Sequence, residues 1–261
     1  LAQAGKINLN SPVYSYLPDF PYSGDITVKQ LLSHTAGIPN PLPLKWIHLA
    51  EEHQGFKRDE FFKGVFKNNS ELKSEPGTKF SYSNLGYVLL GQLIERVSGQ
   101  SFETYVSENI TQRIGIDPKA LSFQIDPSLH ATGYQKWWSF SNFLFGFLID
   151  KEKFMGNKEG KWKPFRNFYN NGTAYGGMVG SATGLISYAQ ALLHDESVLL
   201  NDQYRDILFT EGRINNKPTG MSLSWFTGTL KGNKYYSHAG GGGGYARAPL
   251  FRASSMRPAS E

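Results

Sequence analysis

Apolar residues recur at helical spacing through the first two-thirds of the chain. The strongest pattern predicts a helix over about 83–98, followed by Gly99 at a position that commonly ends helices. A second helix is expected from Val28, because Thr27 can cap it together with Gln30. Further helices are predicted over 57–67, from Ser101 through about 110, and from Thr183.

Strand patterns come late in the chain. Residues 222–229 and 234–237 are predicted as strands with glycine-rich turns between them. Helices first and strands last indicate an α+β fold or a mostly helical lobe beside a sheet. We expect a single domain over 1–261, with the helical lobe over 25–130 and the sheet-associated part over 173–245.

Composition narrows the functional classes. The 261 residues are 39% hydrophobic and 19% charged, which suits a folded globular protein and not a disordered chain. The absence of cysteine excludes disulfides, a thiol nucleophile, iron–sulfur clusters and thiolate zinc sites. The net charge is +5, but the basic residues are spread along the sequence, so we expect no nucleic-acid partner. Nothing in the sequence indicates a cofactor.

An aromatic-rich insertion is expected over 134–172. The stretch from Tyr134 to Tyr169 contains 12 of the chain's 37 aromatic residues. Its apolar part, Trp137 to Ile149, is too short to span a bilayer. Our first interpretation is a segment that packs on the body of the domain. The alternatives are a lid over an apolar substrate pocket and a contact with a membrane surface, for which several lysines are available.

Three local motifs could carry chemistry, and their order matters more than any one of them. The first is LLSHTAGIP at 31–39, which contains His34. The second is PGTKFSYSNLGY at 76–87, which leads into the strongest predicted helix. The third is His238-Ala239-Gly240, at the end of a predicted strand and followed by more glycines.

These motifs resemble those of the serine hydrolases of the penicillin-recognising fold, in particular the branch with class C β-lactamases, D,D-peptidases and esterases. The resemblance runs from GKINLNSPVYSYLPDF through ITVKQLLSHTAGIP, EPGTKFSYSNLGYVLLGQLIERVSGQSFETYV and GGMVGSATGLISYAQALL to HAGGGGGY. It implies an α+β fold with an antiparallel sheet flanked by helices. It also implies hydrolysis of an amide, β-lactam or ester through an acyl-enzyme, in which a Ser-x-x-Lys serine attacks the carbonyl.

The resemblance also implies roles for individual residues. Tyr82 and Asn84 match the Tyr-x-Asn motif, with Tyr82 as the phenolic acid/base, its pKa lowered by neighbouring cations. The amide of Asn84 would face the substrate carbonyl or the lysine. His238 and Gly240 match the His-x-Gly motif, whose strand, with Ala239, would border the substrate and donate a backbone N–H to an oxyanion. For His34 the resemblance implies a structural role, fixing the loop after the helix.

The nucleophile motif has one match, Ser70 to Lys73, and we interpret it as a coincidence. It lies in a polar stretch where the family has a variable loop, whereas a reactive serine needs a buried helix start and a nearby base. We therefore expect no nucleophile in this chain and no acyl-enzyme chemistry from it alone.

Both ends of the chain look shortened relative to the family pattern. We expect the N-terminal strands and the nucleophile helix to be missing, together with the last strand and the closing helix. Pro249 argues against a central strand near the end, and 254–261 resemble a loose tail. No signal peptide is visible, although family members are often periplasmic, secreted or membrane-anchored.

Several alternatives stay open. The chain could be a non-catalytic ligand-binding relative or a gene remnant of the same fold. A phosphate site at Gly240 to Gly244 is disfavoured because the Lys-Ser/Thr of a P-loop is absent. A metal site at His48 and His53 is disfavoured because supporting carboxylates lack ligand spacing. The substrate, the oligomeric state and the compartment cannot be derived from the sequence.

Overall fold

The structure is a computed structural model that describes residues 1–22, 24–139, 149–194, 196–242, 245–247 and 250–252. Its helices are η1 (Val13–Ser15), α1 (Val28–Leu32), η2 (Pro43–Lys45), η3 (Ala50–Gly55), α2 (Arg58–Lys67), α3 (Asn84–Ser98), α4 (Phe102–Val106), the π-helical η4 (Ser107–Thr111), α6 (Lys151–Phe154), α7 (Thr173–Gly176), α8 (Ala182–Leu193) and α9 (Asp202–Phe209). Its strands are β1 (Ile47–Leu49), β2 (Leu121–Ser122), β3 (Tyr134–Lys136), β4 (Trp162–Pro164), β5 (Phe168–Asn170), β6 (Val179–Gly180), β7 (Arg213–Ile214), β8 (Lys217–Pro218), β9 (Phe226–Leu230), β10 (Asn233–Ser237), β11 (Gly240–Gly242), β12 (Tyr245–Arg247) and β13 (Leu250–Arg252). Mixed helices and small antiparallel sheets confirm the α+β fold.

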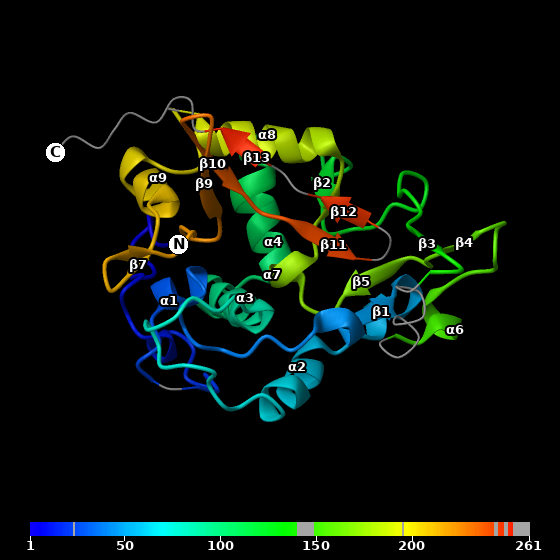
Figure 1. The fold of residues 1–261 in the computed structure, drawn as a ribbon, viewed down its shortest axis with the longest axis horizontal. Helices are drawn as coiled ribbons and strands as arrows, with labels where there is room; N and C mark the ends of the chain where they lie inside the picture. The colour runs from blue at the N-terminus through cyan, green and yellow to red at the C-terminus, as the bar shows by residue number, and fades with distance from the viewer. Residues whose placement is uncertain (23, 140–148, 195, 243–244, 248–249, 253–261) are drawn as a thin grey trace.

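Helix α3 lies at the centre of the main core and packs against α1, α4 and α7 (Figure 1). Its predicted ends are correct to within one residue. The hydroxyl of Ser83 accepts the Gly86 N–H at 3.1 Å, and Gly99 ends the helix with a φ of 72°. One face is buried, through Leu85, Val88, Leu89 and Leu93. Burying such side chains stabilises the fold by about 1.5–3 kcal/mol each, so this helix anchors the lobe.

The late strands form a three-stranded antiparallel sheet in the order β13-β10-β9. Tyr236 of β10 is buried against Leu192 of α8 and Phe209 of α9, so these two helices cover one face of the sheet (Figure 1). The predicted strand over 234–237 is confirmed, but the one predicted over 222–229 begins only at Phe226. The physical reason is a turn at Ser222, whose N–H donates to the Trp225 carbonyl at 2.8 Å.

The C-terminal part adds short strands that the sequence pattern did not predict. Strand β12 pairs with β11, and β13 pairs with β10 at one end of the sheet order. An end position is compatible with a nearby proline, because an outer strand has one edge free of ladder bonds. Pro249 itself and residues 254–261, which we expect to form a loose tail, lie outside the described residues.

The loop after α1 folds tightly under the start of α3. Helix α1 has the predicted capping box of Thr27 and Gln30, but it ends at Leu32, before the stop expected at Gly37. It ends early because His34 already has a left-handed φ of 54°. Gly37 has a φ of 73°, and a Cβ there would lie 2.0 Å from the Ser74 carbonyl oxygen. The loop therefore requires glycine at this position.

We predict that Gly37→Ala destabilises the protein far more than Gly99→Ala, the matched control. Both glycines have a left-handed φ, which costs an alanine about 1–2 kcal/mol. Only Gly37 also faces a backbone clash, which adds about 1–3 kcal/mol, whereas Gly99 has open space. Urea unfolding of the two variants measures the difference. Equal losses would contradict the tight packing of this loop.

Candidate active site

Tyr82 lies in the segment that enters α3, and its side chain meets the end of β10. The Tyr82 hydroxyl is 3.4 Å from Nε2 of His238, although the two residues are 156 positions apart. The ring of Tyr82 lies between His34, at a centroid distance of 4.2 Å, and Phe226 of β9, at 6.4 Å. The structure thus brings together residues from all three motifs that the sequence singled out.

His34 holds this segment in place through hydrogen bonds to the residues on both sides of Tyr82. Its Nδ1 accepts the Ser83 N–H at 3.1 Å, and its carbonyl accepts the Ser81 N–H at 2.8 Å, so it is bonded on both sides of Tyr82. Because Nδ1 is an acceptor, the neutral ring carries its proton on Nε2. Burial, with a smaller contribution from the nearby His238, lowers the pKa of His34 to about 3. His34 is therefore a neutral positioning residue, which agrees with the structural role expected for it.

His238 is half-buried at the end of β10, and Ala239 and Gly240 after it are exposed. Burial lowers the pKa of His238, and a backbone hydrogen bond with Ala239 partly offsets this effect. A Cβ built on Gly240 would meet no atom within 4 Å, so the backbone here is open to an approaching ligand. The geometry is compatible with a strand that borders a substrate, and that role stays a prediction.

Asn84 begins α3 and is held by a residue that the sequence analysis missed. Both its backbone N–H and its Nδ2 donate to Oδ1 of Asn40, at 3.0 and 3.2 Å. Asn40 lies in the proline-rich loop after the His34 motif. Its Oδ1 therefore fixes the direction of the Asn84 amide, and Oδ1 of Asn84 keeps its acceptor capacity. The expected contact with a substrate carbonyl stays a prediction.

Burial changes the expected protonation of Tyr82. The sequence analysis expected neighbouring cations to lower the pKa of this phenol, whereas its burial raises the pKa above the ordinary value of 10.0. Among the described residues no positive charge offsets the burial. In this environment Tyr82 is a protonated donor near neutral pH and cannot act as a base.

Ser70 does not have the surroundings of a nucleophile. It is exposed in the loop after α2, and the four residues from Ser70 to Lys73 form no helical turn. In a Ser-x-x-Lys motif, a helix places both side chains on one face. Here the Lys73 N–H instead donates to the Gly37 carbonyl at 2.7 Å. Figure 1 shows α2 at the lower edge of the fold, whereas β11 lies near the middle of the view.

The two histidines weighed as metal ligands bind each other instead. Nε2 of His48 is 2.8 Å from Nδ1 of His53, and Nδ1 of His48 is 2.8 Å from Oδ1 of Asn171. The adjacent Glu51 and Glu52 form ion pairs with Arg166 and Lys153. Within the described part of the chain, no group of three or more histidines or carboxylates could hold a metal ion.

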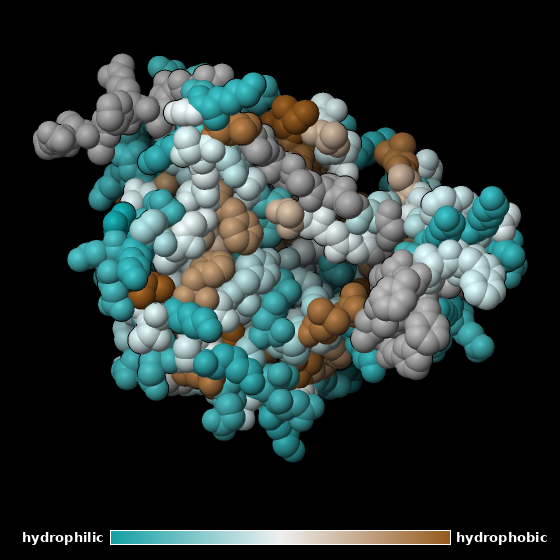
Figure 2. Space-filling model, viewed as in Figure 1, coloured by the Kyte–Doolittle hydropathy of each residue, from teal (hydrophilic) through white to brown (hydrophobic). Residues whose placement is uncertain are grey.

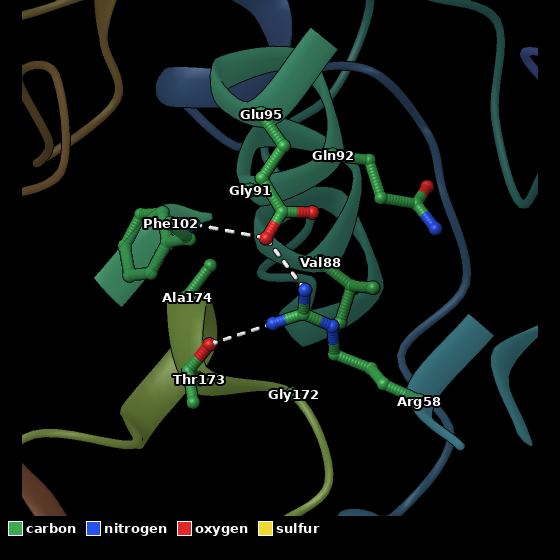
Figure 3. Close-up of a pocket in the computed structure, with 9 residues that line it drawn as sticks. All are labelled: Arg58, Val88, Gly91, Gln92, Glu95, Phe102, Gly172, Thr173 and Ala174. Atoms are coloured by element: carbon green, nitrogen blue, oxygen red, sulfur yellow. Dashed lines mark hydrogen bonds and ion pairs between the residues drawn. The ribbon is translucent and has the colours of Figure 1, made fainter. Parts of the chain in front are cut away.

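A small pocket between α2, α3, α4 and α7 contains an ion-pair cluster (Figure 3). Arg58 contacts Glu95 at 2.5 Å, Glu103 at 3.1 Å and the Thr173 hydroxyl at 3.2 Å. The free space is about 10 Å³, which is room for roughly one water. The ion pairs of Arg58 therefore link these helices. The pocket itself is too small for a substrate.

Several contacts around Tyr82 had no counterpart in the sequence analysis. Tyr87 stacks on the other face of His34 at 4.8 Å and donates to Ser224 at 2.6 Å. Its position four residues after Ser83, on the first turn of the helix, is the sequence feature that could have indicated this. No sequence feature indicated Asn40 or Phe226, because their contacts depend on the tertiary fold.

A mixed helical and antiparallel fold with Tyr-x-Asn placed against His-x-Gly is the arrangement implied by the resemblance to penicillin-recognising serine hydrolases. The family model described as Beta-lactamase matches residues 1–249. The chain belongs to this family.

Individual relatives agree with this assignment. Protein flp of Staphylococcus aureus strain N315 is 32% identical over 141 residues, 52% of this chain and 27% of that protein. Penicillin-binding protein 4* of Bacillus subtilis strain 168 is 25% identical over 252 residues, 94% of this chain and 52% of that protein. The crystal structure of a D-stereospecific amidohydrolase from Streptomyces superposes with a TM-score of 0.69 at 21% identity, covering 97% of this chain and 73% of that one. The chain spans about half or less of the two curated relatives.

We predict that His34→Asn weakens the pH dependence of stability. The folded pKa of His34, about 3, lies below the ordinary value of 6.5, so the unfolded state binds the proton more readily. The stability contribution is present above pH 6.5 and is lost as the pH falls toward 3, at about 1.4 kcal/mol per pH unit.

Asparagine tolerates a left-handed φ and can accept the Ser83 N–H without titrating in this range. Urea unfolding between neutral pH and pH 4 measures the slope for both proteins. We expect the free energy of unfolding of the variant to depend less steeply on pH. The difference in slope should correspond to the uptake of about one proton on unfolding. An unchanged slope would show that His34 is not held neutral.

Proposed function

We propose that this chain is part of a β-lactamase-like serine hydrolase that opens an amide, β-lactam or ester bond through an acyl-enzyme. The observation that carries the proposal is the 3.4 Å approach of the Tyr82 hydroxyl to His238, which unites two family motifs at one point. Two of the similar proteins are named as a penicillin-binding protein and a D-stereospecific amidohydrolase. These names support a substrate with an amide carbonyl.

Each residue has a part in this chemistry. Once a neighbouring cation lowers its pKa, Tyr82 moves a proton from the nucleophile to the leaving group. The amide of Asn84, oriented by Asn40, directs a polar group of the substrate. The exposed backbone from His238 to Gly240 borders the substrate and supplies an N–H to the carbonyl oxygen as it gains negative charge.

The chain alone lacks two parts of this machinery. Ser70 is exposed in a loop outside any helix, so it does not take the role of nucleophile. The pKa of Tyr82 is raised by burial, so the phenol needs a nearby cation before it can accept a proton. A Ser-x-x-Lys helix would supply both groups. We infer that residues 1–261 by themselves perform no acyl transfer.

We predict that the chain gains no covalent adduct from a fluorophosphonate probe or a penicillin. Intact-mass spectrometry measures this, and Ser70→Ala is the control that assigns any label. A stoichiometric adduct that disappears in Ser70→Ala would contradict the inference and make Ser70 the nucleophile.

The same probe applied to the protein from its native source separates the enzyme from a non-catalytic binding relative. An adduct on a serine outside residues 1–261 supports the proposed enzyme. Reversible penicillin binding without an adduct, weakened by Tyr82→Phe, would overturn it in favour of a ligand-binding protein.

A further inference from the structure

The β3–β4 ribbon extends from the body of the molecule on the side opposite α9 (Figure 1). Tyr134 pairs with Pro164, and Lys136 pairs with Trp162. The pairing continues past the strand end, where the Trp137 N–H donates to the Lys161 carbonyl at 2.8 Å. Because side chains alternate across a strand, Tyr134, Lys136 and Trp162 share one face. We call the outer end of this ribbon, residues 134–138 and 158–163, the ribbon tip.

Three of the four aromatic side chains of the ribbon tip are exposed. Trp138 is 85% exposed, Trp162 48% and Tyr134 40%. Of the five tryptophans, Trp46 is buried and Trp137 and Trp225 are half-buried, so the two exposed ones both lie at the ribbon tip. Large exposed aromatic groups gathered in one place indicate an interaction surface. The first interpretation of the insertion, packing on the body, therefore does not describe the ribbon tip.

Positive charge also gathers at the ribbon tip. The ribbon tip has four lysines, Lys136, Lys158, Lys161 and Lys163, and one acidic residue, Glu159. Lys163 lies 4.6 Å and Lys158 6.0 Å from the ring of Trp137. None of the four forms an ion pair with a described residue. At the base of the insertion, by contrast, Lys153 and Arg166 are paired with Glu52 and Glu51.

We propose that the ribbon tip docks the protein on an anionic lipid bilayer. Indole rings favour the boundary between acyl chains and headgroups, because one part of the ring is apolar and its N–H needs a polar partner. The lysines beside them would face the anionic headgroups, where each strengthens binding by about five-fold. The mixed teal and near-white surface of this corner in Figure 2 agrees with a surface that combines charge with amphipathic rings.

The geometry favours a bilayer over a polymer. Single-stranded nucleic acids and similar polyanions bind in a charged groove that follows the backbone, whereas the ribbon tip projects. No helix in the described ranges is long and apolar enough to cross a membrane. Residues 140–148 lie outside the described residues, take no part in the argument and are unchanged in every variant. The proposal is independent of the proposed hydrolase activity.

The test is vesicle flotation, which separates bound protein from any aggregate. We expect the chain to float with vesicles of equal parts phosphatidylglycerol and phosphatidylcholine, with a blue shift of tryptophan emission, and not with phosphatidylcholine alone. Lys158→Glu combined with Lys161→Glu should weaken binding at least about 25-fold. Lys63→Glu combined with Lys67→Glu, the same charge change on exposed positions of α2, should have little effect.

A second pair of variants tests the aromatic contribution. Trp138→Ser combined with Trp162→Ser should abolish both the emission shift and most of the flotation, while circular dichroism shows the fold intact. Binding that survives these changes, or that falls equally with the α2 variant, would overturn the proposal. Binding that a soluble polyanion removes completely, with no emission shift on vesicles, would also overturn it and assign the surface to an acidic polymer.

Discussion

The pairing of the loop after α1 with the segment before α3 determines where the candidate chemistry lies. His34 receives the N–H groups of both Ser81 and Ser83, and the residue between them, Tyr82, is held against its ring. Ser83 caps α3 and also donates its hydroxyl to the Pro39 carbonyl at 2.9 Å. The end of one helix, the start of another and the Tyr82 side chain therefore share one set of bonds. This explains why a buried histidine with a strained φ occurs here.

The same packing limits what Tyr82 can do. Its ring lies between His34 and Phe226, its hydroxyl meets His238, and both imidazoles have lowered pKa values. The phenol is thus surrounded by neutral groups, and desolvation without a compensating charge stabilises its protonated form. Family chemistry needs the opposite, a phenol that can lose its proton. Among the described residues, no cation lies close enough to offset this desolvation.

Sequence reasoning predicted those parts of the molecule that depend on local chemistry. Ser83 and Gly99 fix both ends of α3 by capping, and Thr27 with Gln30 fixes the start of α1, so these boundaries were found. Helix α9 was missed, although Asn201 caps it by accepting the Tyr204 N–H at 3.0 Å. Its core-facing residues, Arg205 and Phe209, do not form an apolar stripe in the sequence.

The features that the sequence did not predict depend on tertiary contacts. Motif order predicted that Tyr82 and His238 would belong to one site, but neither the raised pKa of Tyr82 nor the anchoring of Asn84 by Asn40 follows from spacing.

The most direct test of the central claim is the titration of the Tyr82 phenol, followed by carbon-13 NMR of labelled tyrosine and assigned with Tyr82→Phe. The account predicts that this resonance stays in its protonated position up to pH 10, the ordinary tyrosine pKa. Titration of the phenol near neutral pH in the folded chain would contradict it.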